Sequence, residues 1–219
     1  RMDGDSLGAL LRCRDNQQKI PKSLKKFTCT VPNIVYENNG FLIYAGGDDV
    51  LALLPLEDAL QCAADIRQCY LNAFATQNLE STISAAVEYA HVKTPLTRIL
   101  ADSHHLLDDI AKEQCGRDAL AVRVWKPGGQ ALEWAMPWIK ALAPNPNPTP
   151  QGGREYSLKI EQLAEQFARD DATVKDKETV RFSSKFFYKI RERFDLLNPG
   201  SVGEKAIFDE AEALALLAV

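Results

Sequence analysis

Apolar residues recur along the first part of the chain with two different periods. Steps of three and four residues, which are typical of amphipathic helices, predict helices over 20–35, 57–74 and 95–110. Continuous apolar runs predict strands over 82–90 and 119–125, and two such runs predict a β-hairpin over 41–55. A shorter apolar run from Leu7 predicts a helix near the start of the chain. Pro32 predicts a kink or an early end in the helix that contains it.

The order of these elements predicts an α+β fold. A helix, a hairpin and then alternating helices and strands are typical of a ferredoxin-like palm of the nucleotide cyclase and polymerase type, an antiparallel sheet with helices on one face. We expect this palm over residues 1–143, with a truncated first strand, because almost no residues precede the first motif. We therefore expect the chain to be part of a longer polypeptide.

The remaining residues predict a second domain. Prolines crowd the segment 144–153, a composition typical of a linker. Beyond it, the spacing of leucine, isoleucine and phenylalanine predicts three helices, which would form a small all-α domain over 154–219.

Composition narrows the class of protein. The chain has 219 residues, of which 46% are hydrophobic, so it is long enough for one full core and a smaller appendage. Its five cysteines show no Cys-x-x-Cys pair, which indicates neither a disulfide framework nor a zinc site and favours reduced thiols in the cytoplasm. No apolar run is long enough to span a membrane, and no signal peptide is visible.

The net charge of −4 provides no general attraction for nucleic acid. Two basic clusters, over 19–26 and 185–193, could contact a phosphate backbone, although a solvated helix face is the commoner explanation for each.

The predicted hairpin carries two glycines followed by two aspartates, Gly46, Gly47, Asp48 and Asp49, at its tip. Glycine allows the positive φ of a tight turn and lets a phosphate approach the backbone. Adjacent carboxylates repel each other unless a cation lies near them. A solvated turn without chemistry explains this tetrapeptide equally well when it is taken alone.

A second pair of carboxylates, Asp3 and Asp5, lies near the start of the chain around a glycine. Palm-type enzymes hold acidic residues on neighbouring strands, where divalent cations assist phosphoryl transfer. We therefore expect Asp3, Asp5, Asp48 and Asp49 to converge on Mg²⁺ or Mn²⁺ beneath the phosphates of a nucleotide.

These motifs resemble the polymerase/cyclase-like large subunit of type III CRISPR effector complexes, closest to the Cmr subtype. The resemblance rests above all on the hairpin 40–55 and on 1–8, with further matching segments at 82–84, 91–96, 111–117 and 182–186. The chain would match only the second palm and the C-terminal helical domain of that longer subunit. It contains no His-Asp dipeptide of the family's nuclease domain.

The resemblance implies that the palm converts ATP into cyclic oligoadenylates when the complex captures target RNA. Asp3, Asp48 and Asp49 would be catalytic and would hold the metal with Asp5. Gly46 and Gly47 would admit the triphosphate, while Ser84 and Lys112 would contact the nucleotide. Relatives commonly have glycine near Ala86, whose methyl group would narrow the pocket. The implied partners are ATP, the other subunits, guide RNA and target RNA, and no membrane.

One palm supplies only half of a nucleotide site in this family, so we expect the isolated chain to be inactive or very weak. A diguanylate cyclase shares the hairpin but prefers Glu-Phe where this chain has Asp49 and Val50. A viral RNA-dependent polymerase also carries Gly-Asp-Asp, yet this chain is too short for its fingers and thumb. A non-catalytic scaffold subunit is the strongest alternative, and the acidic residues at both strand positions disfavour it.

Overall fold

The computed structural model describes residues 1–126, 128–129, 131–144 and 156–165. The chain divides into two compact units, Arg1–Leu158 and Lys159–Val219. The first unit extends to Leu158, beyond the predicted palm boundary at residue 143. Of the second unit only helix α6 (Lys159–Glu165) is described. The rest of the predicted all-α domain, and the predicted linker after Pro144, lie outside the described residues.

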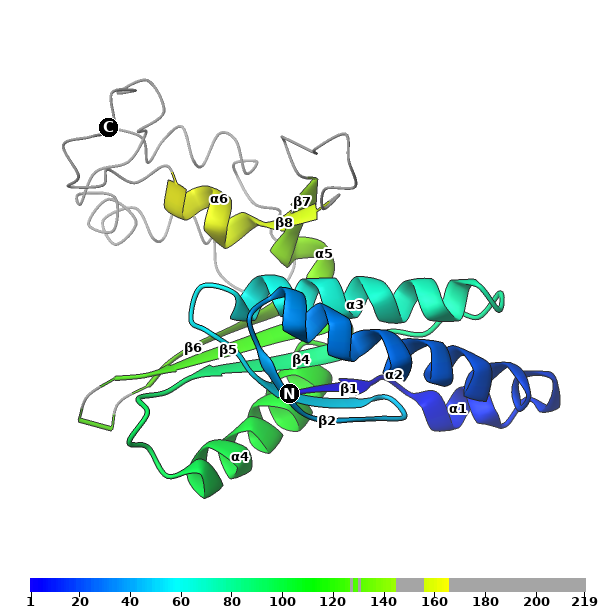
Figure 1. The fold of residues 1–219 in the computed structure, drawn as a ribbon, viewed down its shortest axis with the longest axis horizontal. Coiled ribbons are helices and arrows are strands. Elements are labelled where there is room, and N and C mark those ends of the chain that lie inside the picture. Colours follow the sequence, from blue (N-terminus) through cyan, green and yellow to red (C-terminus); the bar gives the residue numbers. More distant parts are fainter. Residues whose placement is uncertain (127, 130, 145–155, 166–219) are drawn as a thin grey trace, which may run out of the picture. The chain divides into compact units, whose positions relative to one another are not determined.

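A six-stranded sheet forms the centre of the first unit (Figure 1), in the order β2-β3-β1-β4-β5-β6. Its strands are β1 (Met2–Gly4), β2 (Phe41–Gly46), β3 (Asp49–Leu53), β4 (Ile83–Tyr89), β5 (Ala119–Trp125) and β6 (Ala131–Pro137). The short β1 lies between β3 and β4 and is antiparallel to both. The first carboxylate motif is therefore central in the sheet.

The expectation of an α+β palm is confirmed, but the expectation of a fully antiparallel sheet is wrong. Strands β4 and β5 are parallel, with Ala85 opposite Leu120, while the other neighbouring pairs are antiparallel. The physical reason is the helical connection between β4 and β5. A crossover of this length carries the chain back over the sheet, so that the next strand runs in the same direction.

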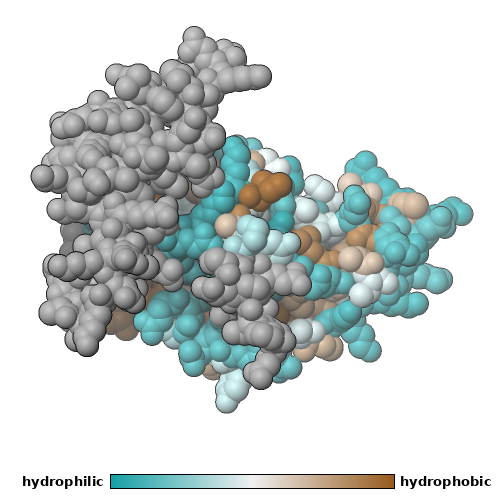
Figure 2. Space-filling model, turned by 90° about the horizontal axis from the view of Figure 1, so that it is seen from above, coloured by the Kyte–Doolittle hydropathy of each residue, from teal (hydrophilic) through white to brown (hydrophobic). Residues whose placement is uncertain are grey.

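Helices cover both faces of the sheet, so the expectation of helices on one face is also wrong. Figure 1 shows α2 (Lys19–Glu37) and α3 (Ala59–Ala75) on one side of the sheet and α4 (Leu96–His105) on the other. Phe27, Tyr70 and Phe74 fill the core beneath α2 and α3. Viewed from that side, the described surface is mostly hydrophilic with separated apolar residues (Figure 2). This pattern is typical of amphipathic helices with their apolar faces buried.

The opposite face has a smaller core of its own. Helix α4 continues without interruption into a π-helical segment, η2 (Leu106–Gln114). Leu106, Leu107 and Ile110 of η2 cluster with small residues of β4 and β5, including Ala86 and Ala121. Two layers of helix therefore enclose β4 and β5, since alternate residues of a strand point to opposite faces.

Helix α2 runs through Pro32 to Glu37, so it does not end early at this proline. Pro32 is exposed, whereas Val31 and Val35 on its two sides are buried in the core. Their packing outweighs the backbone hydrogen bond that a proline removes.

The predicted strand over 119–125 matches β5, and the predicted strand over 82–90 matches β4 to within one residue at each end. The predicted helix from Leu7 matches α1 (Leu7–Leu11). The sequence did not predict β6 or the short 3₁₀ turn η1 (Arg14–Asn16). A second small sheet pairs β7 (Leu142–Pro144) with β8 (Tyr156–Leu158), and α5 (Trp138–Ala141) precedes it. No helix in the described ranges is both long and apolar enough to cross a membrane.

Candidate active site

The tip of the β2–β3 hairpin is a two-residue turn made by Gly47 and Asp48. Gly46 pairs with Asp49 across the hairpin, and Gly47 has a φ of +65°. Glycine is favoured there because a left-handed conformation at the first position of a two-residue turn is costly for other residues. The Thr28 hydroxyl donates a hydrogen bond of 3.2 Å to the Gly47 carbonyl, so α2 holds the tip in place.

Gly46 serves a different purpose from Gly47, because its φ is not positive. A Cβ atom at this position would lie 2.2 Å from the hydroxyl oxygen of Tyr44, whose side chain folds along the same strand. Only one of the two glycines is therefore required by the conformation of the turn, and the other leaves room for a neighbouring ring.

Asp3 and Asp49 meet across β1 and β3. Met2 pairs with Val50 in antiparallel register, which places Asp49 opposite Asp3 on the same face of the sheet. The two carboxyl groups are close enough to share a hydrogen bond. Burial, followed by the charge and hydrogen bond of Asp3, raises the pKa of Asp49. The Arg1 guanidinium, 4.0 Å from Asp49, opposes this shift.

Asp48 approaches the same centre from the turn. A Cβ atom at Gly4 would lie 2.7 Å from Oδ2 of Asp48 and 2.7 Å from the hydroxyl oxygen of Tyr70. Asp48 therefore packs directly against the backbone of β1, beside a buried tyrosine. Burial raises the pKa of Asp48, the charge of Asp3 raises it further, and Lys112 opposes the change.

Lys112 brings a positive charge to these carboxylates from η2. Its ammonium group forms an ion pair with Asp3 and a longer one, of 3.5 Å, with Asp108 one turn earlier. Burial alone would lower the pKa of Lys112, but the hydrogen bond and charge of Asp3, with the charge of Asp108, outweigh it and raise that pKa. Lys112 is thus held charged beside Asp3, where it neutralises part of the negative charge that a metal ion would otherwise meet.

Asp5 and Ser84 lie beside Asp3, buried and hydrogen-bonded to each other. Asp5 is 4% exposed and accepts hydrogen bonds from the hydroxyls of Thr82 and Ser84, both 2.8 Å, and from the backbone N–H of Asp118 at 3.0 Å. Ser84 is completely buried. These contacts tie the end of β1 to the residues where β4 and β5 begin, and they occupy the oxygens of Asp5 in this conformation. Asp3 pairs with Ser84 in the antiparallel register, and the Asp5 backbone N–H donates a hydrogen bond of 2.8 Å to the Thr82 carbonyl, so Asp5 lies on the same face of the sheet as Asp3. The metal-binding role of Asp5 and the nucleotide contact of Ser84 stay predictions.

The remaining acidic residues fit a divalent cation that arrives with phosphates. Among the described residues no group of three or more histidine, cysteine, aspartate or glutamate side chains is arranged to hold a metal ion. Mg²⁺ and its analogues, however, commonly take one or two carboxylates and complete their coordination with substrate phosphates. Asp3 and Asp49 provide such a pair, and their mutual repulsion favours a cation.

The sequence analysis missed two residues that shape this site. Gly4 lies inside the Asp-Gly-Asp motif and makes room for Asp48, so its small size was a readable signal. Tyr70 belongs to the apolar stripe of α3, and nothing in its spacing distinguishes it from an ordinary core residue. Its hydroxyl makes a hydrogen bond of 3.1 Å with Ser81, and burial raises its pKa.

Comparison with known proteins identifies relatives of this chain. The family model for the second palm domain of Cas10/Cmr2 matches residues 1–121. The chain is 38% identical over 121 residues to the CRISPR system Cmr subunit Cmr2 of Pyrococcus furiosus, and 30% identical over 129 residues to the CMR subunit Cmr2 of Saccharolobus solfataricus. These alignments cover 54% and 50% of this chain but only 14% and 12% of the relatives. The chain belongs to the Cas10/Cmr2 second-palm family.

Proposed function

We propose that this palm is one half of a nucleotidyltransferase site that makes cyclic oligoadenylates from ATP within a type III CRISPR complex. The observation that carries the proposal is the meeting of Asp3 and Asp49 across neighbouring strands, with Asp48 and Lys112 beside them. The family supports a transferase of this class, and the relatives' names support assembly with other Cmr subunits. We place guide RNA, target RNA and a cytoplasmic location within the same proposal.

The proposed reaction joins the 3′-oxygen of one ATP to the α-phosphorus of the next, while the bond to pyrophosphate breaks and the hydroxyl loses its proton. Asp3 and Asp49, with Asp48, would hold Mg²⁺ or Mn²⁺, which when bound lowers the pKa of the hydroxyl and neutralises phosphate charge. Gly47 leaves the turn open on its outer side, since nothing lies within 4 Å of a Cβ placed there. Lys112 is charged and can exchange Asp3 for a phosphate oxygen.

The surface beside Asp49 supports the proposal of a half-site. Leu53 lies on the same face of β3 as Asp49 and pairs with Phe41 of the edge strand β2. Phe41 is 68% exposed and Leu53 is 52% exposed. Exposed apolar residues on the same hairpin as Asp49, about 13 Å along the strand from it, favour docking of a second protein surface. We therefore expect the isolated chain to bind nucleotide but to turn over little or none of it.

The test is Asp49→Asn in the complete complex, supplied with guide RNA, target RNA, ATP and Mn²⁺. We expect oligoadenylate production to fall by about 100-fold or more, because a ligand carboxylate is lost at the reacting phosphates. Asp15→Asn makes the same change of charge at an exposed residue of η1 and should leave the rate unchanged. Undiminished production by Asp49→Asn would refute the assignment, and so would an equal loss in both variants.

A further inference from the structure

A hollow lies at the end of strands β4 and β5, away from the acidic residues. It has a volume of about 690 Å³ and opens where the parallel strands β4 and β5 end, between the segments 89–98 and 124–129. Cavities of this size are typical of sites for small ligands or for short stretches of a polymer. Asp3 pairs with Ser84 near the start of β4, so about 20 Å of strand separates the two places.

Three positive side chains lie among the residues of the mostly apolar lining. Lys93 and Arg98 come from the turn after β4 and from α4, and Lys126 follows β5. All three are exposed, and within the described parts of the chain no ion pair joins any of them to a carboxylate. In a chain with a net charge of −4, this is a local concentration of unneutralised positive charge.

Three carboxylates of β4, α4 and β6 each have a partner. Glu88 accepts a hydrogen bond from the indole N–H of Trp125, and Arg123 forms ion pairs with Asp102 and Glu133. They therefore leave the three exposed cations of the hollow for an anion from outside.

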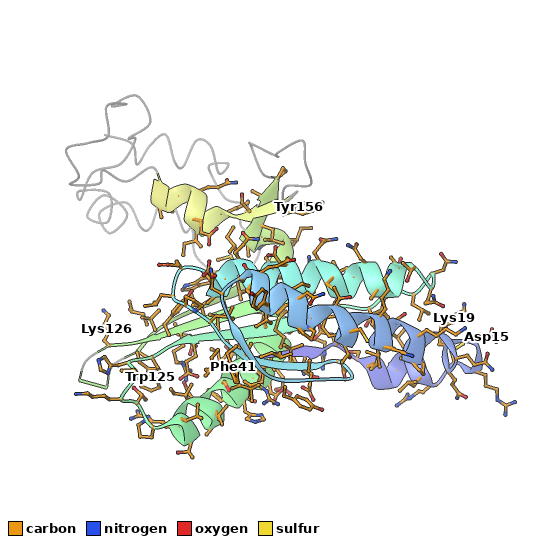
Figure 3. All side chains as sticks on the ribbon, viewed as in Figure 1. Asp15, Lys19, Phe41, Trp125, Lys126 and Tyr156 are labelled. Carbon is orange, nitrogen blue, oxygen red and sulfur yellow. The ribbon has the colours of Figure 1, made fainter. Side chains whose placement is uncertain are left out.

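An aromatic ring accompanies the charges. Trp125 lines the hollow at the end of β5, and the guanidinium of Arg98 lies over its ring at 4.5 Å. The hydrogen bond to Glu88 fixes the edge of the indole, so the ring is held in place before any ligand arrives. Figure 3 shows Trp125 and Lys126 together at the end of the sheet. Cations next to a fixed aromatic ring are the combination that binds unpaired nucleotides.

The turn that carries Lys93 is also ordered by its own hydrogen bonds. The Lys93 backbone N–H donates a hydrogen bond of 3.2 Å to Nδ1 of His91, and the Thr94 backbone N–H donates one of 2.8 Å to the His91 carbonyl. His91 is thereby given a structural role, and Lys93 starts from a defined backbone. Less conformational entropy is lost when such a residue binds a phosphate.

We propose that this hollow, defined by Lys93, Arg98, Trp125 and Lys126, binds a short segment of single-stranded nucleic acid. Cations on three different elements suit successive phosphates of a strand better than the single cluster of a mononucleotide. The aromatic ring offers a stacking surface for one base. The site lies apart from the acidic centre and needs no divalent cation.

The test uses the full 219-residue chain and a short fluorescein-labelled oligouridylate in EDTA, which removes any contribution of metal at the acidic centre. Binding is followed by fluorescence anisotropy as a function of salt. The double variant Lys93→Glu/Lys126→Glu is compared with Arg12→Glu/Arg14→Glu, which changes the charge equally at two exposed residues near the end of α1. Circular dichroism of each variant verifies that it is folded.

We expect the first pair to weaken binding by about 10-fold or more and to lower the salt slope by about 1.4, or ~0.7 for each lost phosphate contact. The control pair should leave both quantities unchanged. Bound oligouridylate should quench tryptophan fluorescence, and Trp125→Phe should abolish this quenching. An equal loss in both pairs would overturn the proposal, as would unchanged binding in the first pair or no binding by the wild-type chain. If ATP displaced the labelled oligouridylate at a concentration equal to the Kd of the oligouridylate, the proposal would also be overturned, and a mononucleotide site would replace it.

Discussion

Replacing Gly4 by alanine tests how closely Asp48 and Tyr70 pack against β1. The added Cβ would lie 2.7 Å from Oδ2 of Asp48 and from the Tyr70 hydroxyl oxygen, which is closer than such contacts allow. The Asp48 side chain can rotate away. Tyr70 cannot, because it is completely buried, stacked on Phe74 at 4.5 Å and in edge contact with Phe27 at 5.0 Å.

The expected magnitude follows from two opposing effects. Overpacking a rigid site costs about 1–3 kcal/mol, and the lower entropy of the unfolded alanine chain returns ~0.4–1 kcal/mol. We therefore expect Gly4→Ala to lower the free energy of unfolding by about 1–2 kcal/mol. Gly8→Ala is the matched control, because nothing lies within 4 Å of its Cβ and it belongs to helix α1. It should stabilise the protein by ~0.5–1 kcal/mol.

Urea unfolding followed by tryptophan fluorescence measures both changes. Trp125, Trp134 and Trp138 all lie within Arg1–Leu158, so the signal reports the unit that contains the glycines. The two variants should differ by about 2 kcal/mol. Equal stability of Gly4→Ala and Gly8→Ala would refute the packing of Asp48 and Tyr70 against β1.

The remaining predictions concern two polar contacts of the sheet. Burial, followed by the charge of Asp102, raises the pKa of Glu88 from 4.5 to about 7. The folded protein therefore binds more protons than the unfolded one between these pH values. Protonated Glu88 stabilises the fold relative to its ionised form, and this advantage is lost as pH rises through 7. Glu88→Gln should therefore raise the free energy of unfolding near pH ~8 by about 1 kcal/mol, a value reduced for solvent screening, with no gain near pH ~4; urea titrations at the two pH values measure it, and an equal gain at both would contradict the pKa shift. Arg67 donates two hydrogen bonds of 2.8 Å to Asp118 and lies 5.7 Å from the Trp138 ring. Arg67→Met should lower the free energy of unfolding by about 2 kcal/mol, because it leaves the partly buried carboxylate of Asp118 unpaired. An unchanged thermal unfolding transition would show that this pair contributes nothing to stability.

Much of the fold was readable because periodicity and burial agree. The apolar stripe of α2 and the continuous runs of β4 and β5 follow directly from which face of each element meets the core. The stripe over 95–110 predicted a helix but not its change to π-helical form at Leu106, since a π-helix is defined by i→i+5 backbone hydrogen bonds that the spacing of apolar residues does not record.

Other features depend on partners that lie far away in the sequence. Strand β6 lies at the edge of the sheet, with three exposed residues followed by four half-buried ones, and it includes a glutamate, so it lacks the apolar run that identified β5. Asp3 and Asp5 belong to one short motif, and nothing in it distinguishes their roles. Asp5 is buried because Thr82, Ser84 and Asp118, which are distant in the sequence, donate hydrogen bonds to it. The hairpin and its pairing with Asp3 were expected from motif and fold together, whereas Tyr70 could be identified only from coordinates.

The most direct test of the central claim is binding of Mn²⁺ in the presence of a non-hydrolysable ATP analogue, measured by electron paramagnetic resonance on the 219-residue chain. This measurement needs no turnover, so it does not depend on a second palm. The account predicts that Asp3→Asn and Asp49→Asn each weaken Mn²⁺ binding by about 10-fold or more, while Asp15→Asn leaves it unchanged. Wild-type affinity in both Asp3→Asn and Asp49→Asn would contradict it.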